Sequence, residues 1–83
     1  MELYKWYKGN ELPDTIDGYM DCLIIFTWYG HQEISIGRFT WAGRGVGREL
    51  IPFWYGRFPL IPKIPQENII SWMPIEFPKE VSW

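Results

Sequence analysis

Proline and glycine are spread along this whole chain and leave little room for a helix. Seven prolines and eight glycines occur among 83 residues, and both residue types are poor formers of helix interiors. No long stretch repeats apolar residues at the i, i+3, i+4 and i+7 spacing of an amphipathic helix. The sequence therefore predicts a mainly β protein with little or no helix.

The aromatic content decides how so short a chain can build a core. A chain of this length forms one domain, residues 1–83, and buries only about 60 to 65% of its unfolded surface. Six Trp, five Tyr and five Phe residues are present, and each ring can bury on the order of 150 to 250 Å². We expect these rings in the core and also at the surface, in a ligand cleft or in the interface of a homo-oligomer.

Two apolar runs form the centre of the predicted sheet. The run "CLIIFTWYG" (22–30) is typical of a central strand, "YGHQ" of a turn, and "EISIGRFTWAG" (33–43) of the second strand of a hairpin. In that second strand Ile34 and Ile36 share one face, whereas Phe39 and Trp41 fall on the other. We expect a β-bulge at Gly37 that brings both pairs onto the same side.

The remainder of the chain is interrupted by prolines. "LIPFWYGRF" (50–58) is a further apolar run, and "FPLIPKIPQ" (58–66) predicts extended, polyproline-like chain that crosses the surface or packs as an edge. Ile69 to Trp72 reads as a short strand that Pro74 and Pro78 stop. We predict an antiparallel sheet of three to five strands with a bulged hairpin and Pro-rich extended segments. The C-terminal aromatics should pack on the sheet or on a neighbouring subunit: Trp72, Phe77 and Trp83.

The cysteine count and the hydropathy pattern indicate the compartment. Cys22 is the one cysteine, which excludes an internal disulfide and favours a reducing environment, with a buried strand thiol. The N-terminal residues lack the apolar run of a signal peptide, and no apolar stretch approaches the ~20 residues of a membrane helix. We expect a soluble, cytoplasmic protein with no membrane partner.

Arginine is confined to the middle of the chain. Residues 38–57 hold all four arginines against one glutamate, a local charge of +3, while the whole chain carries −2. The guanidinium group suits phosphate and carboxylate and stacks on aromatic rings. This segregation predicts a surface that faces an anion. Long DNA or RNA is disfavoured as a partner, because the overall charge is negative.

The glycine-rich segment "AGRGVGRE" (42–49) has two interpretations. It lacks the G-x-G-x-x-G spacing of a dinucleotide-binding turn and the G-K-[ST] ending of a P-loop, and Pro52 disfavours a long helix after it. The segment can be a hairpin connection whose glycines supply positive φ. Alternatively, its backbone N–H groups, with Arg44 and Arg48, can cap an anion.

Catalytic and metal-binding patterns are weak. His31 is the one histidine and lies in the predicted turn, while Cys22 lies on a buried strand, so a reactive Cys–His pair is disfavoured. One His and one Cys do not fill a zinc site. Asp14, Asp17 and Asp21 miss the spacing of a calcium loop and indicate a solvated acidic face. We predict that the protein is not an enzyme and uses no metal or cofactor.

Both ends of the chain carry a motif pattern. Trp6 precedes Leu12-Pro13, an apolar strand follows at 22–26, and the chain approaches its end with "ISWMPIEFP" (70–78). This pattern resembles the domain-of-unknown-function family numbered 551, which is carried mostly by phages and prophages. Trp72, Met73, Pro74 and Pro78 match its tail, whereas Ser71 stands where the family usually has His and Phe77 where it has Pro. The resemblance implies a small β-rich phage protein of the host cytoplasm and carries over no catalytic residue.

Two binding hypotheses follow from these observations. In the first, aromatic rings stack on a base while arginines hold phosphate, and the protein sequesters a nucleotide-derived immune signal of the host. The candidate ligand-binding residues are Arg38, Trp41, Arg44, Arg48, Trp54, Tyr55 and Arg57. In the second, an aromatic and arginine surface centred on residues 52–58 binds a host defence protein. A structural part of a virion is a third interpretation.

Overall fold

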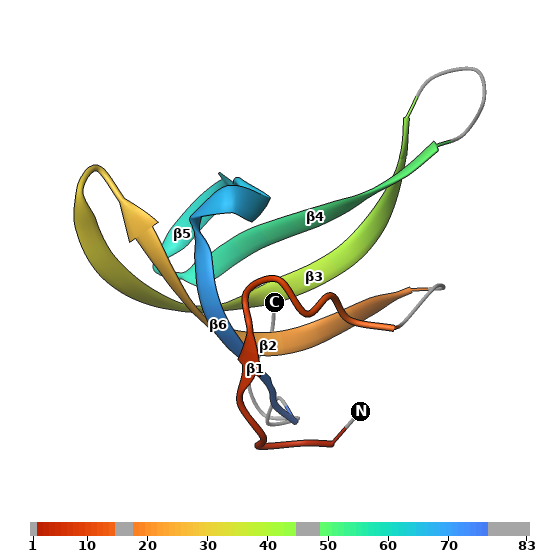
Figure 1. The fold of residues 1–83 in the computed structure, drawn as a ribbon, viewed down its shortest axis with the longest axis horizontal. Coiled ribbons are helices and arrows are strands. Elements are labelled where there is room, and N and C mark those ends of the chain that lie inside the picture. Colours follow the sequence, from red (N-terminus) through yellow and green to blue (C-terminus); the bar gives the residue numbers. More distant parts are fainter. Residues whose placement is uncertain (1, 15–17, 45–48, 77–83) are drawn as a thin grey trace.

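The computed structural model describes residues 2–14, 18–44 and 49–76, which form one antiparallel sheet (Figure 1). The strands are β1 (Tyr7–Lys8), β2 (Tyr19–Trp28), β3 (His31–Arg44), β4 (Glu49–Phe58), β5 (Leu60–Ile64) and β6 (Ile69–Pro74), with one 3-10 helix, η1 (Gln66–Asn68). Their order across the sheet is β1-β6-β2-β3-β4-β5. The mainly β prediction is confirmed, but the described chain has six strands instead of three to five.

The β2–β3 hairpin is the most regular part of the sheet. Its pairing runs in unbroken register from Tyr19↔Thr40 to Trp28↔His31. Tyr29 and Gly30 form the turn, and both have positive φ, 49° and 80°, which is the pattern of a type I′ turn. The segment "YGHQ" predicted a turn centred on Gly30 and His31. The observed turn is centred on Tyr29 and Gly30, one residue earlier.

Tyr29 is a poor residue for this turn and provides the first testable prediction. Its ring is 88% exposed and has an edge contact with Trp28, at 5.3 Å between ring centroids, while a bulky side chain at positive φ is strained. Replacing Tyr29→Asn should raise the free energy of unfolding by about 1 kcal/mol, because Asn tolerates this conformation. Urea denaturation measures the change. A Tyr29→Val control should be destabilised, and equal effects of the two variants would contradict the assignment.

Alternation along β2 and β3 defines two faces of the sheet. The inner face packs the core and the outer face is its opposite. Along β2, Cys22, Ile24 and Phe26 are fully buried on the inner face. On β3, Phe39 is fully buried, whereas Ile34 is 50% exposed on the outer face. The expectation that these two residues share one side was wrong, because pairing with β2 preserves the alternation of β3 throughout.

An irregularity does occur beside Gly37, but it lies in the pairing of β3 with β4, while the pairing of β3 with β2 is regular. Ile36 pairs with Phe58 and Gly37 pairs with Gly56, so Arg57 is the extra residue and β4 carries it. The backbones approach closely here, since a Cβ added to Gly37 would overlap the carbonyl oxygen of Tyr55. Two facing glycines therefore allow β3 and β4 to come together on the inside of the curved sheet.

The Pro-rich segment 60–64 is a ladder strand and not polyproline-like chain. β5 pairs with β4 through Ile64, Ile61 and Leu60, and the expectation of an edge element is confirmed. Pro62 is tolerated because an edge strand needs N–H donors on one side alone. Pro52, inside β4, precedes the first β5 contact at Trp54, so β4 has no β5 partner at that position.

Aromatic rings from distant strands meet inside the sheet. Trp54 of β4 and Trp72 of β6 are fully buried, with ring centroids 5.9 Å apart, although β2 and β3 lie between their strands. The sheet must therefore curl around the core, as Figure 1 shows. The core residues are Cys22, Ile24, Phe26, Phe39, Trp54, Ile61, Ile64, Ile69 and Trp72.

One glutamine connects the two ends of the curled sheet. The Trp54 Nε1–H donates to Gln66 Oε1, and Gln66 Nε2 donates to the Gly9 carbonyl at 2.7 Å. Gly9 follows β1 directly, and Trp72 Nε1 donates to the Glu11 carbonyl at 2.8 Å in the same turn. These bonds join β4 to the β1 turn and close the curl.

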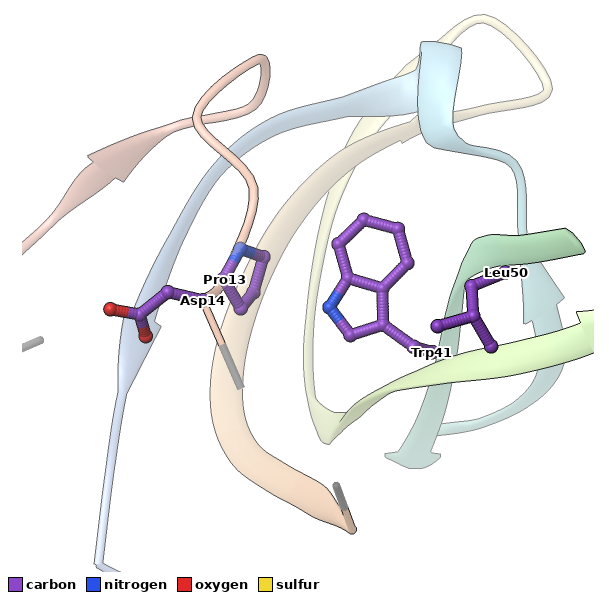
Figure 2. A pocket seen from close by; sticks show the side chains of 4 residues that line it. All are labelled: Pro13, Asp14, Trp41 and Leu50. Carbon is purple, nitrogen blue, oxygen red and sulfur yellow. The ribbon is translucent and has the colours of Figure 1, made fainter. Parts of the chain in front are cut away.

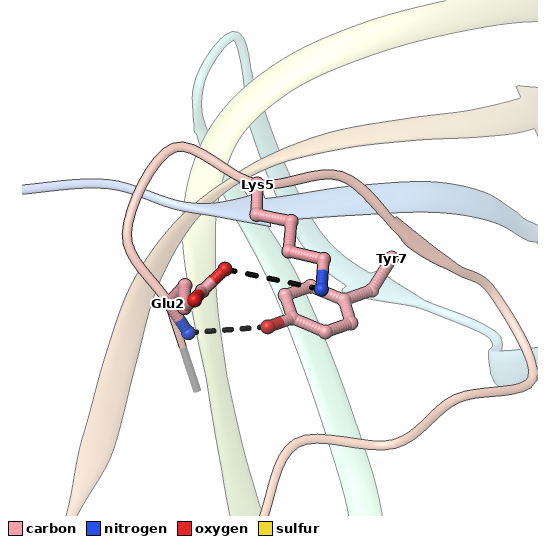
Figure 3. A network of polar contacts seen from close by, with 3 residues as sticks. All are labelled: Glu2, Lys5 and Tyr7. Atoms are coloured by element: carbon pink, nitrogen blue, oxygen red, sulfur yellow. Dashed lines mark hydrogen bonds and ion pairs between the residues drawn. The ribbon is translucent and has the colours of Figure 1, made fainter.

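The N-terminal segment packs along β6 beside this closure. Tyr7 stacks on Trp72 with centroids 4.7 Å apart, and the Glu2 backbone N–H donates to the Tyr7 hydroxyl at 3.1 Å (Figure 3). Lys5 lies 3.8 Å from Glu2, but both side chains are mostly exposed, so this pair contributes little. The stacked ring and the backbone hydrogen bonds from Tyr4 to Pro74 and from Gly9 to Ile70 hold the segment to β6. Trp72, one of the C-terminal aromatics, thus packs in the sheet as expected, while residues 77–83 lie outside the described residues.

Candidate functional site

The predicted ligand-binding residues fall on different faces of the sheet. Trp41 and Trp54 lie on the inner face, whereas Arg38 and Tyr55, which pair with each other across β3 and β4, lie on the outer face. A single site cannot use all four side chains. The structure therefore divides the predicted set into an inner and an outer group.

An apolar hollow lies beside Trp41 of the inner group. Pro13, Asp14, Trp41 and Leu50 line a hollow of about 400 Å³ with almost entirely apolar walls. In Figure 2 the indole of Trp41 projects from β3 toward Pro13, and the Asp14 carboxylate points away from the indole. Trp41 is partly exposed and makes an edge-to-face contact with Phe39, with centroids 5.4 Å apart. This contact orients an indole at the wall of an apolar hollow, where a flat ring can stack.

Trp54 does not contribute to that hollow. Its side chain is fully buried and its Nε1–H is bonded to Gln66, so it offers no ring face to a ligand in this arrangement. Adjacent residues of a strand point to opposite faces, which explains why Trp54 is in the core while Tyr55 is on the outer face.

The outer group is organised around Arg38. Its Nε donates to Asp21 Oδ1 at 2.8 Å, and its guanidinium lies 3.8 Å from the centre of the Tyr19 ring. Burial lowers the pKa of Arg38, but hydrogen bonds to Asp21 and Tyr55 and the charge of Asp21 outweigh it and raise the pKa. Arg38 is therefore committed to neighbours within the protein.

The remaining predicted arginines are spread along the β3–β4 hairpin. Arg44 is the last residue of β3 and its backbone pairs with Glu49, but its side chain lies outside the described part of the structure. Arg48 also falls outside the described residues, as does the rest of segment 45–48. Arg57 is exposed at the irregularity of β4. The two interpretations of the glycine-rich segment thus stay predictions.

The register separates the two residues considered for nucleophilic chemistry. Cys22 pairs with Gly37, whereas His31 pairs with Trp28 at the hairpin tip, about 20 Å further along at ~3.4 Å per residue. Burial, reinforced by the charge of Asp21, raises the pKa of the Cys22 thiol far above its ordinary value. Burial therefore favours the protonated thiol, which is a much weaker nucleophile than the thiolate. Within the described ranges, no three His, Cys, Asp or Glu side chains are grouped to hold a metal ion.

Sequence reasoning missed three of the four described residues that line the hollow. Pro13 and Asp14 lie in the segment between β1 and β2, and Leu50 pairs with Gly43 near the end of the β3–β4 hairpin. Parity along the hairpin could have placed Leu50 on the same face as Trp41. Pro13 had no such signal, because its position depends on how the segment after β1 crosses the curled sheet.

The chain was compared with models of known protein families, with curated proteins and with solved structures, and none of the three comparisons finds a match. The resemblance to the phage family therefore stays a prediction. None of the helices in the described ranges is long and apolar enough to span a membrane.

Proposed function

We propose that this chain is a non-enzymatic binding protein whose hollow takes the flat ring of a nucleotide-derived ligand. The proposal rests on one observation. Trp41, predicted as a stacking residue, lines an apolar hollow of about 400 Å³. A volume of this size is within the range of small-ligand sites.

The affinity of such a site depends on more than stacking. Stacking on one aromatic side chain contributes ~1 to 3 kcal/mol per base, whereas nanomolar binding needs about 12 kcal/mol. Charge-assisted contacts to phosphate are roughly twice as strong as neutral hydrogen bonds. We therefore propose that Arg48 holds the phosphate groups while Trp41 holds the base, since Arg44 has the opposite parity to Trp41 in β3, so that the protein can sequester a host immune signal made from nucleotides.

A thermal-shift experiment tests this proposal. Mono-, di- and cyclic nucleotides, NAD and ADP-ribose, with the parent nucleosides, are added to the purified protein. A ligand at ~100 times its dissociation constant should add roughly 2.7 kcal/mol of stability, a shift of several degrees. The ligand-induced shift should become clearly smaller in Trp41→Ala, because stacking supplies ~1 to 3 kcal/mol of the binding free energy, and should persist in full in the exposed control Leu60→Ala. Nucleosides should give a smaller shift than nucleotides.

The outcomes of this experiment separate the base from the phosphate contribution. If the Arg44→Ala/Arg48→Ala double variant loses the ligand-induced shift while Trp41→Ala keeps it, the ligand binds at the arginines and not in the hollow. The absence of a shift with every compound would overturn a nucleotide-derived ligand.

The two alternatives, an inhibitor of a host defence protein and a structural virion protein, both require a protein-contact surface. The outer face carries Phe53 and Tyr55 of the predicted segment 52–58, with ring centroids 5.9 Å apart. This face is the part of the described chain that would supply such a contact.

A further inference from the structure

The hollow beside Trp41 has two walls that come from separate parts of the chain. Trp41 and Leu50 belong to β3 and β4, whereas Pro13 and Asp14 belong to the segment between β1 and β2 (Figure 2). In the sheet, β6 and β2 separate β1 from β3. Pairing between neighbouring strands therefore does not set the distance between the two walls, and tertiary contacts must set it.

The Pro13 wall is fastened at the turn that follows β1. The Gly9 carbonyl accepts a hydrogen bond from Gln66 Nε2 at 2.7 Å. Two residues further on, the Glu11 carbonyl accepts from Trp72 Nε1 at 2.8 Å. Pro13 follows after two more residues, and its side chain is fully buried. The position of this wall therefore depends on Gln66 and Trp72.

The Trp41 wall is connected to the same glutamine through a row of aromatic rings. The Trp41 indole meets Phe39 edge to face, and Phe39 packs on Trp54 with ring centroids 4.6 Å apart. The Trp54 Nε1–H then donates to Gln66 Oε1. Phe39 and Trp54 are fully buried, and close-packed side chains transmit a displacement to their neighbours. A shift of the Trp54 indole should therefore reach Trp41.

Gln66 is suited to hold these two walls at a fixed separation. The end of its side chain carries one carbonyl oxygen and one NH₂ group; the oxygen accepts from Trp54 and the NH₂ group donates to Gly9, and these two bonds form the Gln66 bridge. Gln66 is only partly buried, so water can satisfy either partner when the side chain is absent. Separate waters do not fix the distance between the two partners. The particular contribution of the amide is thus geometric.

We propose that Gln66 is a positioning residue for the hollow, and that the Gln66 bridge sets the distance between Pro13 and Trp41. The inference deepens the proposed function and rests on it for the ligand alone. Gln66 is not among the described residues that line the hollow, so it acts through the walls. Without the bridge the walls take a range of separations, and only a fraction of the molecules can hold a flat ring. The apparent Kd rises by the inverse of that fraction, so a competent fraction of about one tenth gives tenfold weaker binding.

Two substitutions of Gln66 and one control test the inference. Gln66→Met removes both hydrogen bonds, and Gln66→Asn keeps the amide on a side chain that is one methylene too short to reach both partners. The control Phe26→Leu leaves a cavity in the same core and should lower the melting temperature by a comparable amount. Phe26 pairs with Glu33, whereas Trp41 is eight positions further along β3, about 27 Å at ~3.4 Å per residue.

Isothermal titration of the full chain with ADP-ribose, well below the melting temperatures, is the first measurement. The Kd should rise about tenfold or more in both Gln66 variants and stay within about twofold of wild type in Phe26→Leu. A purely structural role of Gln66 would lower the melting temperature and leave the Kd unchanged, because nearly all molecules are folded at the temperature of the titration.

Fluorine NMR of protein labelled with fluorotryptophan tests the geometry without a ligand. The Trp41 resonance, assigned by its loss in Trp41→Phe, should shift or broaden in both Gln66 variants and keep its wild-type position in Phe26→Leu. A Trp41 resonance that the Gln66 variants leave unchanged, or that Phe26→Leu moves as much, overturns the inference.

The two measurements separate this inference from the proposed function. If ADP-ribose binds and all variants have the same Kd, the positioning role of Gln66 is wrong while the proposed function stands. If ADP-ribose does not bind wild type but the Trp41 resonance responds to Gln66 and not to Phe26→Leu, Gln66 sets the geometry of the hollow, and it is ADP-ribose as a ligand that fails.

Discussion

Gly37→Ala should lower the free energy of unfolding by about 3 kcal/mol or more, the largest effect among the variants considered. The added Cβ would overlap the Tyr55 carbonyl oxygen and come 3.0 Å from the Gly56 Cα. These are backbone atoms of β4, and they cannot rotate away as a flexible side chain can. A domain of this size has only some 5 to 12 kcal/mol of total stability, so a loss of about 3 kcal/mol should lower the melting temperature by roughly 12 to 24 °C.

A second glycine of the same strand supplies the matched control. A Cβ added to Gly43 meets nothing within 4 Å, so Gly43→Ala should change the stability by no more than about 0.5 kcal/mol. Urea denaturation of both variants measures the difference. If Gly37→Ala were as stable as Gly43→Ala, the close approach of β3 and β4 at the centre of the curl would be wrong.

Removal of the Gln66 bridge should have the second-largest effect. Gln66→Met keeps the side-chain volume but leaves the Trp54 N–H and the Gly9 carbonyl without their partner. An unpaired buried polar group costs about 1 to 3 kcal/mol, and Gln66 itself is only partly buried, so water compensates in part. We expect a loss of about 2 kcal/mol in urea denaturation. Gln32→Met, at an exposed position of β3, is the control and should be close to neutral.

The charged variant adds a test of which group donates to Gly9. In Gln66→Glu, an ionised carboxylate accepts from Trp54 but cannot donate to the Gly9 carbonyl, whereas a protonated carboxyl can do both. The folded protein should therefore raise the pKa of the new carboxyl. Its stability relative to wild type should be greatest below the ordinary glutamate pKa of about 4.3 and decline as the pH rises through the raised value. A difference that does not change with pH would contradict the hydrogen-bond geometry.

The division of the candidate site was partly readable from the sequence. Side chains alternate along a strand, so Trp54 and Tyr55 had to point to opposite faces once 50–58 was a strand. Arg38 and Trp41, three residues apart, differ in parity as well. The predicted set therefore mixed two faces. The predicted arginine cluster was based on closeness in the sequence alone. In the structure, Arg38 forms an ion pair with Asp21.

Other errors had causes that the sequence did not contain. β5 was assigned as polyproline-like chain because its prolines argue against a ladder, yet an edge strand tolerates Pro62 on its unpaired side. Whether a strand is at an edge depends on the order of the whole sheet. We expected the β-bulge at Gly37, and the observed irregularity lies beside this residue. The extra residue, however, is Arg57 of the partner strand β4. No property of residues 33–43 could show that the partner strand would carry it.

The sequence by itself determined the β class, the strands of the 19–44 hairpin and the burial of Cys22, because these follow from alternation, propensity and turn residues within a short window. The tertiary structure alone decided the curl, its closure and the composition of both faces. Gln66 bonds to Gly9 across 57 residues, and Pro13 reaches the hollow of Trp41 and Leu50 from a separate segment. Such contacts depend on the packing of strands far apart in the chain, and local residue patterns do not indicate which distant backbone segments come together.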